Sequence, residues 1–282
     1  MTSGEADLTI THADAAVVGT ADSATLTVSG QTAGKFTETS ASAGGIETLN
    51  VVSKGSANTV NITSARNAVT TLNISGDQNL TTTLVSDNIA TIDASTFTGD
   101  LTLKGTTAGA TFGQTITTGV GNDLLEFDTG ELTEHDVVDL GGNTVLTSGK
   151  MGKDTVTHTG NHGSAVTQQI LTVSNVEDLQ LTASGGADQA GTFYLDTSKF
   201  TNVDQVSVAA ASGTAKFTNL DTNTTIGLGV AADDFSGTLN VALADETGTS
   251  DSITLNESST LDASSGITFK STGIETLNFV EH

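Results

Sequence analysis

The chain has 282 residues, and its 33 Asp and Glu against nine Lys and Arg give a formal net charge of −24. This charge argues against a nucleic-acid partner, whose phosphates need a basic surface, and against an anionic membrane surface. The absence of Cys excludes disulfides and thiolate metal sites.

Proline is also absent, which fits a chain in which a strand ladder uses nearly every backbone N–H. No run of 18 apolar residues occurs, so we expect neither a transmembrane helix nor membrane insertion. Residues 1–7 are polar and lack the basic and apolar regions of a cleavable signal peptide. If the protein is exported, we expect a route that needs no such peptide.

In chain order, the first strong feature is the hexapeptide Gly-Ile-Glu-Thr-Leu-Asn at residues 45–50, which returns at residues 273–278. Both copies, and four looser ones between them, follow the pattern apolar-x-x-apolar-x-apolar. The first three sets start 23 and 20 residues apart, which is typical of one supersecondary unit stacked repeatedly, with each coil burying its apolar row against the next. The six sets are Ile46/Leu49/Val51, Val69/Leu72/Ile74, Ile89/Ile92/Ala94, Val176/Leu179/Leu181, Val203/Val206/Val208 and Ile274/Leu277/Phe279.

Short segments with the periodicity of strands occur throughout, for example at residues 24–29, 101–103 and 239–243. Clusters of Gly, Ser, Asn and Asp separate them, and no long stretch shows a helical apolar stripe. We therefore predict an all-β fold, a parallel β-solenoid or β-roll of short stacked strands with Gly/Asp-rich turns and little helix. Composition suggests Thr-rich repeats at 1–117, a Gly/Asp-rich, calcium β-roll-like segment at 118–165 and Thr-rich repeats at 166–282, although one continuous solenoid fits equally well.

The sharpest local motif is Gly-Val-Gly-Asn-Asp-Leu-Leu at residues 119–125, which fits the calcium β-roll nonapeptide from its second glycine onward. An approximate second copy spans residues 149–156, and a degenerate turn lies between them at 139–143. Glycines allow carbonyl oxygens to face an ion, and Asp supplies charge. The predicted cofactor is Ca²⁺, with an ordinary Gly-Asn-Asp turn as the alternative. The candidate metal ligands are Gly119, Gly121, Asn122, Asp123, Asp139, Gly152 and Asp154.

Other turns carry acidic side chains that could add ligands, namely Asp77, Asp87, Asp100, Asp128, Asp233 and Asp234. His158 and His162 have a spacing that could bind zinc on a helix, but interleaved glycines favour an exposed loop, and we expect His135 on the surface too. No nucleophile elbow or phosphate-binding loop is present, so we expect no catalytic activity. Thr-x-Thr triplets, which could order water on a flat face, are irregularly spaced and more typical of ordinary exposed strands.

Four phrases, in order, are similar to one family: Gly-Ile-Glu-Thr-Leu-Asn-Val at 45–51, Thr-Thr-Leu-Asn-Ile-Ser-Gly-Asp at 70–77, Gly-Val-Gly-Asn-Asp at 119–123 and Thr-Gly-Thr-Ser-Asp at 247–251. On these residues the chain resembles the C-terminal lattice-forming region of the Caulobacter-type S-layer proteins, an RTX-related family exported by type I secretion. The resemblance covers roughly residues 45–280. It implies a β-solenoid, a two-dimensional array on the cell surface, and calcium as the assembly cofactor.

The leading hypothesis is therefore an extracellular structural protein that forms a calcium-dependent, S-layer-like array with copies of itself. A cell-surface glycan or lipopolysaccharide would be bound through a domain outside this sequence. The alternative is a ligand-binding or stalk segment of a large RTX-type secreted adhesin, which would stay monomeric with calcium bound. A β-helical enzyme acting on polysaccharide is a third hypothesis, weakened by the absence of Trp and a single Tyr.

Overall fold

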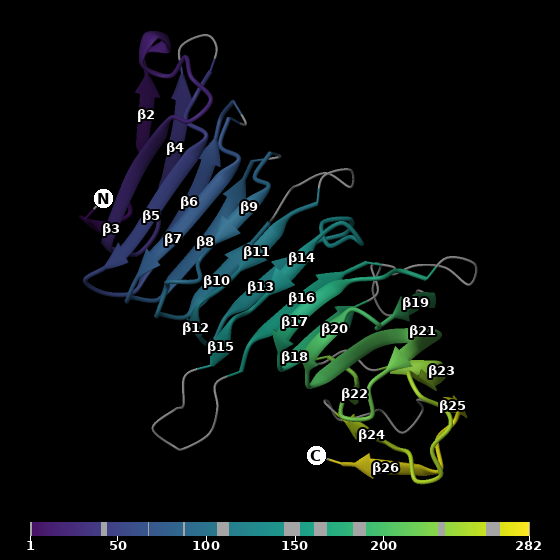
Figure 1. The fold of residues 1–282 in the computed structure, drawn as a ribbon. Coiled ribbons are helices and arrows are strands. Elements are labelled where there is room, and N and C mark those ends of the chain that lie inside the picture. The colour runs from purple at the N-terminus through teal and green to yellow at the C-terminus, as the bar shows by residue number, and fades with distance from the viewer. Residues whose placement is uncertain are drawn as a thin grey trace. The chain divides into compact units, whose positions relative to one another are not determined.

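The computed structural model describes residues 2–40, 44–66, 68–86, 88–105, 113–143, 153–160, 168–182, 190–230, 235–257 and 266–281. About 60% of these residues lie in strands, and the helical content of this part of the chain is a single 3-10 turn, η1 (Asp14–Ala16). None of the described helical segments is long and apolar enough to cross a membrane. The predicted all-β parallel solenoid is confirmed (Figure 1).

The chain divides into two compact units, residues Met1–Phe127 with His135–Asp154, and residues Asp128–Glu134 with Thr155–His282. The division into three zones by composition stays a prediction. Unit 1 carries β1 (Thr2–Gly4), β2 (Leu8–His12), β3 (Ser23–Gln31), β4 (Lys35–Ser40), β5 (Thr48–Lys54), β6 (Asn58–Ser64), β7 (Thr71–Gly76), β8 (Leu80–Val85), β9 (Thr91–Asp93), β10 (Leu101–Lys104), β11 (Thr115–Thr117), β12 (Val120–Gly121), β13 (Leu124–Phe127), β14 (Val137–Asp139) and β15 (Gly142–Asn143).

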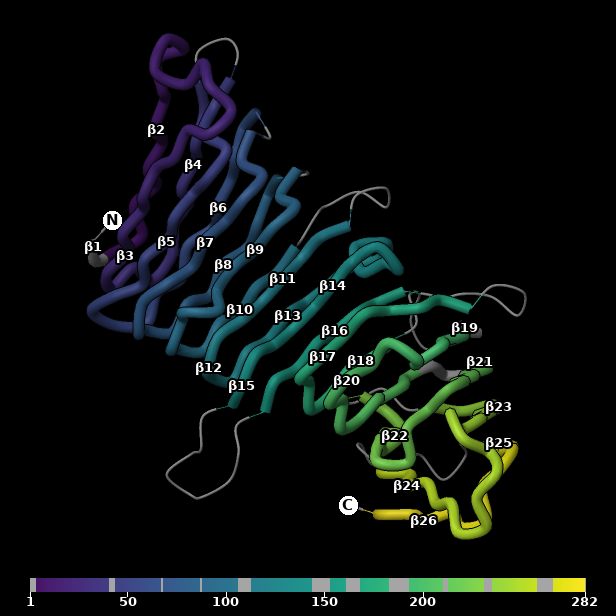
Figure 2. Tube along the Cα trace, viewed as in Figure 1, coloured from purple at the N-terminus to yellow at the C-terminus, as the bar shows by residue number. Residues whose placement is uncertain are grey.

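Successive strands of unit 1 alternate between two parallel sheets, so that each coil contributes one strand to each sheet (Figure 2). One sheet has the order β1-β3-β5-β7-β9-β11-β14, and the other β2-β4-β6-β8-β10-β13. The short pair β12-β15 forms between two later coils. This path explains the interval of 20 to 23 residues between apolar sets, because it is the length of one coil.

Identical positions of successive coils lie side by side in register. Leu49 pairs with Leu72, and Leu72 with Ile92, so the repeated apolar residues form columns through the interior. Each of these three side chains is at most 1% exposed. Burial of this size contributes about 1.5–3 kcal/mol for each large aliphatic side chain. On the outer face Asn73 lies beside Asn50 and donates its Nδ2 proton to Oδ1 of Asn50 over 2.8 Å.

Unit 2 follows the same principle but contains one much longer strand, β21 (Gln205–Leu220), which belongs to two sheets. It carries β16 (Thr155–Thr159), β17 (Thr172–Val176), β18 (Asp178–Thr182), β19 (Ala190–Asp196), β20 (Phe200–Val203), β21 (Gln205–Leu220), β22 (Thr225–Leu228), β23 (Phe235–Leu243), β24 (Ser252–Glu257), β25 (Ile267–Thr272) and β26 (Thr276–Val280). One sheet has the order β16-β18-β21-β22-β24-β26, and β17 pairs with β20. The second half of β21 leaves the first sheet and pairs with β19 and β23, and β23 pairs with β25.

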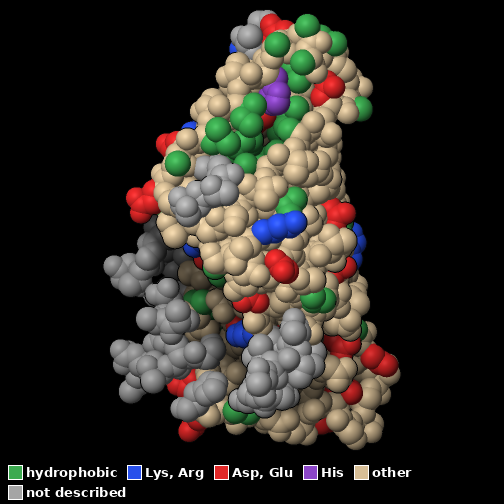
Figure 3. Space-filling model, turned by 90° about the vertical axis from the view of Figure 1, so that its left-hand side faces the viewer, with side chains coloured by type: hydrophobic (Ala, Val, Ile, Leu, Met, Phe, Trp, Pro, Cys, Tyr) green, Lys and Arg blue, Asp and Glu red, His purple; other side chains and the backbone are tan. Residues whose placement is uncertain are grey.

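Five of the six predicted apolar sets are buried, with exposures of 6% or less. The sixth differs: Leu277 is 45% exposed and Phe279 is 50% exposed. These residues lie on β26, the last strand of its sheet order. At the other end of the chain, Ile10 on β2 is 37% exposed. Figure 3 views the side on which β2 and β3 lie in Figure 1, and there hydrophobic side chains gather around a histidine.

Candidate functional site

The predicted metal ligands of the first motif lie at one corner of unit 1, where the chain passes from β11 to β13. Gly119 precedes the short strand β12, Gly121 is its last residue, and Asn122 and Asp123 follow it. Asp139 ends β14 in the next coil. Asp154 is completely buried and lies beside Asp123, while Gly152 lies outside the described residues.

Side-chain oxygens at this corner accept hydrogen bonds from the backbone of neighbouring coils. Oδ1 of Asp123 accepts the N–H of Leu101 over 2.8 Å, and the N–H of Asp123 donates to Oδ1 of Asp154 over 2.7 Å. Oδ1 of Asn122 likewise accepts the N–H of Lys153 over 2.8 Å. These bonds satisfy backbone donors where the chain turns between the sheets. The motif therefore joins coils to one another.

The same arrangement continues through earlier coils, at Asp100, which sequence analysis named as a possible additional ligand, and at two asparagines that it missed. Oδ1 of Asp100 accepts the N–H of Asn122 over 2.8 Å, and Oδ1 of Asn79 accepts the N–H of Asp100 over 3.0 Å. One coil earlier, Oδ1 of Asn58 accepts the N–H of Gln31 over 2.8 Å. We call Asn58, Asn79, Asp100, Asn122, Asp123 and Asp154 the corner ladder. In the middle of the ladder an Asn or Asp recurs every 21 or 22 residues. This spacing is the sequence signal from which the ladder could have been predicted.

The two glycines of the motif are required by close approach of the coils. A Cβ atom on Gly119 would lie 2.0 Å from the carbonyl oxygen of Phe97, and one on Gly121 would lie 2.6 Å from that of Gly99. The carbonyl oxygen of Gly119 itself accepts the N–H of Gly142 over 3.1 Å. Packing alone thus accounts for glycine at these positions.

Asp123 is a predicted ligand whose carboxyl group is buried. Its side chain is 1% exposed, and its Oδ2 atom lacks a hydrogen bond of good geometry. Burial raises the pKa of the Asp123 carboxyl, and hydrogen bonding to Thr118 and to the backbone of Leu101 offsets only part of this rise. A cation near Oδ2 would counteract this rise, since an opposite charge favours the ionised form.

The carboxylate and imidazole side chains of the described residues do not by themselves gather into a metal site. Calcium takes six to eight oxygen ligands. Within the described ranges no group of three or more His, Asp or Glu side chains comes close enough to hold a metal ion. Asp139 uses Oδ1 to accept the N–H of Gly141 over 3.0 Å, and the side chains of Asp77 and Asp128 are exposed. Asp87, Asp233 and Asp234 lie outside the described residues. Calcium binding at this corner stays a prediction.

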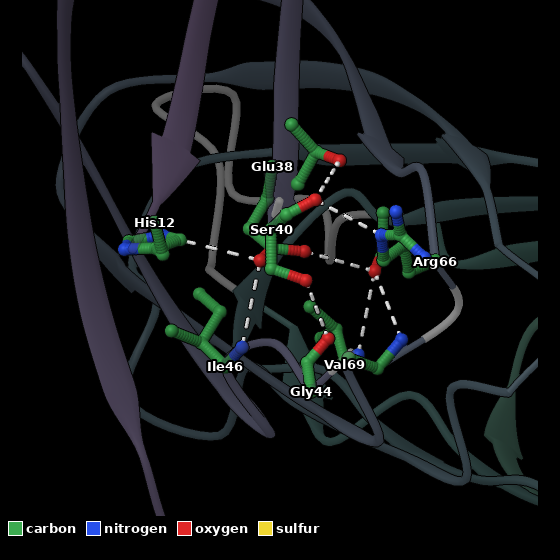
Figure 4. Close-up of polar contacts among 10 residues, drawn as sticks. His12, Glu38, Ser40, Gly44, Ile46, Arg66 and Val69 are labelled. Atoms are coloured by element: carbon green, nitrogen blue, oxygen red, sulfur yellow. Dashed lines mark hydrogen bonds and ion pairs between the residues drawn. The ribbon is translucent and has the colours of Figure 1, made fainter. Parts of the chain in front are cut away.

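A second buried polar cluster lies where the first three coils meet, around Glu38 of β4 (Figure 4). Glu38 is 1% exposed and occupies an inward-facing position, beside Ile10 of β2 and Ser64 of β6. Its Oε2 accepts the hydroxyl proton of Ser64 over 3.1 Å, and its Oε1 lies 3.9 Å from Nε2 of His12. The backbone N–H of Ile46 donates to Oε1 over 3.5 Å.

Neighbouring groups extend the Glu38 cluster toward the turn that leads to β5. Nε of Arg66 donates to the carbonyl oxygen of Ser40 over 3.0 Å. The hydroxyl group of Ser40 donates to the carbonyl oxygen of Gly44 over 2.8 Å. The cluster therefore fixes the corner ahead of the first hexapeptide. Sequence analysis missed it, although Glu38 falls on the inward parity of the strand that contains Phe36.

The histidines give one confirmed expectation and one correction. His135 is exposed, as predicted. His158 was expected in an exposed loop but is 3% exposed on β16, in a column with Leu181 of β18. Burial lowers the pKa of His158 to about 4. His162 lies outside the described residues.

Comparisons of the chain with family models, with curated proteins and with solved structures found no match.

Proposed function

We propose that this chain is a structural protein of an extracellular, S-layer-like array that assembles from copies of itself in the presence of calcium. The observation that carries the proposal is that buried polar side chains form hydrogen bonds between coils. In the corner ladder and in the Glu38 cluster they bond one coil to the next. Such interactions build a rigid scaffold, and stacked-repeat proteins generally serve as extended surfaces.

The role of calcium in this proposal follows from charge. With 33 acidic and nine basic residues, copies of the chain repel one another unless cations neutralise part of that charge. Exposed carboxylates such as those of Asp77 and Asp93 are open to bridging by a divalent ion. Extracellular calcium modules bind with dissociation constants of about 10⁻⁴ to 10⁻³ M, so assembly would respond to export into a calcium-rich medium.

Light scattering and circular dichroism test the proposal. Purified protein is titrated with CaCl₂ and then with a chelator, and MgCl₂ at equal ionic strength serves as the control. We expect particle size to rise with calcium, to fall with chelator, and to respond less to magnesium. Unchanged size and unchanged dichroism across the calcium titration would end the calcium-assembly proposal. A chain that binds calcium but remains monomeric would instead favour the stalk or ligand-binding segment of an adhesin.

A further inference from the structure

The hexapeptide repeat gives the same local structure in both units. The N–H of Asp22 donates to Oε2 of Glu47 over 2.7 Å, and the N–H groups of Glu47 and Thr48 both donate to the carbonyl oxygen of Asp22 over 3.0 Å. In the second copy, Asp251, Glu275 and Thr276 make the same three bonds, over 2.9, 3.0 and 3.0 Å. One edge of β5 and one edge of β26 are therefore bonded alike.

The opposite edges of these two strands differ. At β5 the next coil is in place: the N–H groups of Thr70 and Thr71 donate to the carbonyl oxygen of Glu47 over 2.9 and 3.0 Å, and Leu49 is 1% exposed. At β26, no further strand pairs with this edge within the described residues. Its inward row, Leu277 and Phe279, is about half exposed, although its partners on β24, Ile253 and Leu255, are buried.

The first coil presents a complementary edge. Strand β2 is bonded to β4 on one side and ends its sheet order on the other. Leu8 and Ile10 lie beside Phe36 and Glu38, which are 1% exposed, so they belong to the inward row of that sheet. Leu8 is half-buried and Ile10 is 37% exposed.

Neither edge carries the features that usually block strand addition. Natural edge strands are protected by charged side chains, by proline or by bulges. Strand β26 reads Thr-Leu-Asn-Phe-Val and β2 reads Leu-Thr-Ile-Thr-His, without proline, Lys, Asp or Glu. Both have the length and the apolar spacing of the strands that already pair inside the chain.

We propose that β26 of one copy pairs in parallel with β2 of a second copy, so that copies stack head to tail as one coil stacks on the next. This inference rests on the proposed function, because it names the contact through which copies assemble. The contact is continuous with the coil-to-coil interface inside the chain, which already shows what covers a hexapeptide strand. Because the two edges are different surfaces, the contact is heterologous and generates an open row of copies if its rotation does not close a ring.

Charge predicts how this contact responds to salt. Glu275 and Glu281 flank β26, while Glu5, Asp7 and Asp14 lie near β2. Both edges are thus bordered by carboxylates, and stacking brings like charges together. Screening shortens the range of this repulsion from about 30 Å at 0.01 M salt to about 3 Å at 1 M. Association should therefore strengthen with salt, the opposite of an interface held by ion pairs.

Sedimentation velocity separates this inference from the proposed function. The protein is run in dilute buffer with chelator, in about 1 M NaCl with chelator, and in about 5 mM CaCl₂. We expect monomers in the first solution and oligomers in the other two. Oligomers in NaCl without any further effect of calcium would support stacking and contradict the calcium proposal. Monomers in NaCl with assembly in calcium would overturn stacking and leave the calcium proposal standing. Monomers in all three solutions would overturn both.

Charge-insertion variants test which edges meet. Phe279→Lys and Ile10→Lys each place a cation in one inward row, and Val85→Lys is the matched control because Val85 is 53% exposed on β8, away from both end coils. We expect each edge variant to weaken association at least 10-fold, while Val85→Lys leaves it unchanged. Circular dichroism checks that all three remain folded. Equal association of wild type and edge variants would overturn the inference.

Mixing the two edge variants distinguishes head-to-tail stacking from a symmetric contact. Each mixed pair retains one intact junction, between β26 of the Ile10→Lys copy and β2 of the Phe279→Lys copy. We expect mixed dimers to form in NaCl although neither variant self-associates, and we expect no longer oligomers. A symmetric β26–β26 contact would instead let the Ile10→Lys variant dimerise alone, which would rule out the proposed pairing.

Discussion

At the scale of single residues, this molecule places ionisable side chains in positions where its other coils have apolar ones. Glu38, Asp123 and His158 are each at most 3% exposed. Their burial is tolerated where backbone or hydroxyl donors satisfy them, as the N–H of Leu101 does for Asp123 and the hydroxyl of Ser64 does for Glu38. The cost of burial should appear as sensitivity to substitution and to pH.

Substitution of Asp123 distinguishes corner bonding from metal binding. Asp123→Asn keeps an oxygen that can accept the N–H of Leu101 and removes a buried charge, so we expect stability in chelator to be unchanged or raised. Asp123→Ala leaves that N–H without its acceptor and should cost about 1–3 kcal/mol of unfolding free energy. Urea denaturation measures both. If Asp123 also binds calcium, Asp123→Asn loses the calcium-induced stabilisation of the wild type, whereas a purely structural role leaves that increment intact.

His158 predicts a loss of stability in mild acid. Its pKa is about 4 in the folded chain against 6.5 for an ordinary His, so between pH 6.5 and pH 4 only the unfolded state takes up a proton at this site. The contribution of this group to the free energy of unfolding is complete above pH 6.5 and decreases as the pH is lowered. The loss is about 2 kcal/mol between pH 7.5 and pH 5.

The matched variant for this test is His158→Leu, because Leu181 is the column neighbour of His158. Denaturant unfolding of wild type and variant at the two pH values isolates the histidine from the titration of the many carboxylates. We expect a shallower loss of stability in the variant, and equal losses in both proteins would contradict the assignment.

At the scale of elements, the coil is held by register and by close backbone approach. Gly76, the last residue of β7, has φ of +118°, and a Cβ atom there would lie 2.1 Å from the carbonyl oxygen of Ser53. Gly4 has a similar φ of +130° with nothing within 4 Å. The two positions therefore separate backbone strain from lack of space.

Alanine substitutions at these two glycines should differ in cost. Gly4→Ala introduces strain alone, about 1–3 kcal/mol, and Gly76→Ala adds a steric clash of similar size. We expect the urea midpoint to fall further for Gly76→Ala. If the two midpoints fell equally, the close approach of β5 and β7 would not be limiting at this position.

The sequence predicted the stacked coils well because the apolar sets recur at the length of a coil. Leu49, Leu72 and Ile92 were predicted to stack and do lie in register. Glu38 and His158 share the inward parity of Phe36 and Val156 on their strands, but their burial was not predicted, because a single charged or polar residue in an alternating strand is equally typical of a position left open to solvent. The Gly-Asn-Asp corner was ambiguous for a related reason, since glycine and short acceptor side chains suit both a calcium turn and the corner ladder.

At the scale of the whole molecule, two segments of identical sequence differ in solvent exposure. Glu-Thr-Leu-Asn occurs in the covered coil of β5 and again in β26, whose inward row is half exposed. Because the local sequence is the same, the intrinsic exchange rates of the Leu and Asn amides are closely matched. Differences between the two copies then report on local opening alone.

Hydrogen exchange in dilute buffer with chelator should resolve this difference. We expect the amides of Leu49 and Asn50 to exchange at least ~100-fold more slowly than those of Leu277 and Asn278, because covered strands open only with larger parts of the structure. In NaCl, stacking should slow the second pair specifically. Equal protection of both pairs in the monomer would contradict the exposed state of β26.

The shared register of β5, β7 and β9 also makes the length of the protein adjustable. Removing residues 71–90 would bring Thr91 directly after Thr70 and place Ile92 beside Leu49, where Leu72 now lies. Such a deletion shortens the stack by one strand spacing, about 4.8 Å, and joins surfaces that already fit similar neighbours. We therefore expect a variant with this deletion to fold, and we expect the number of coils to set the length of the stack without changing its architecture.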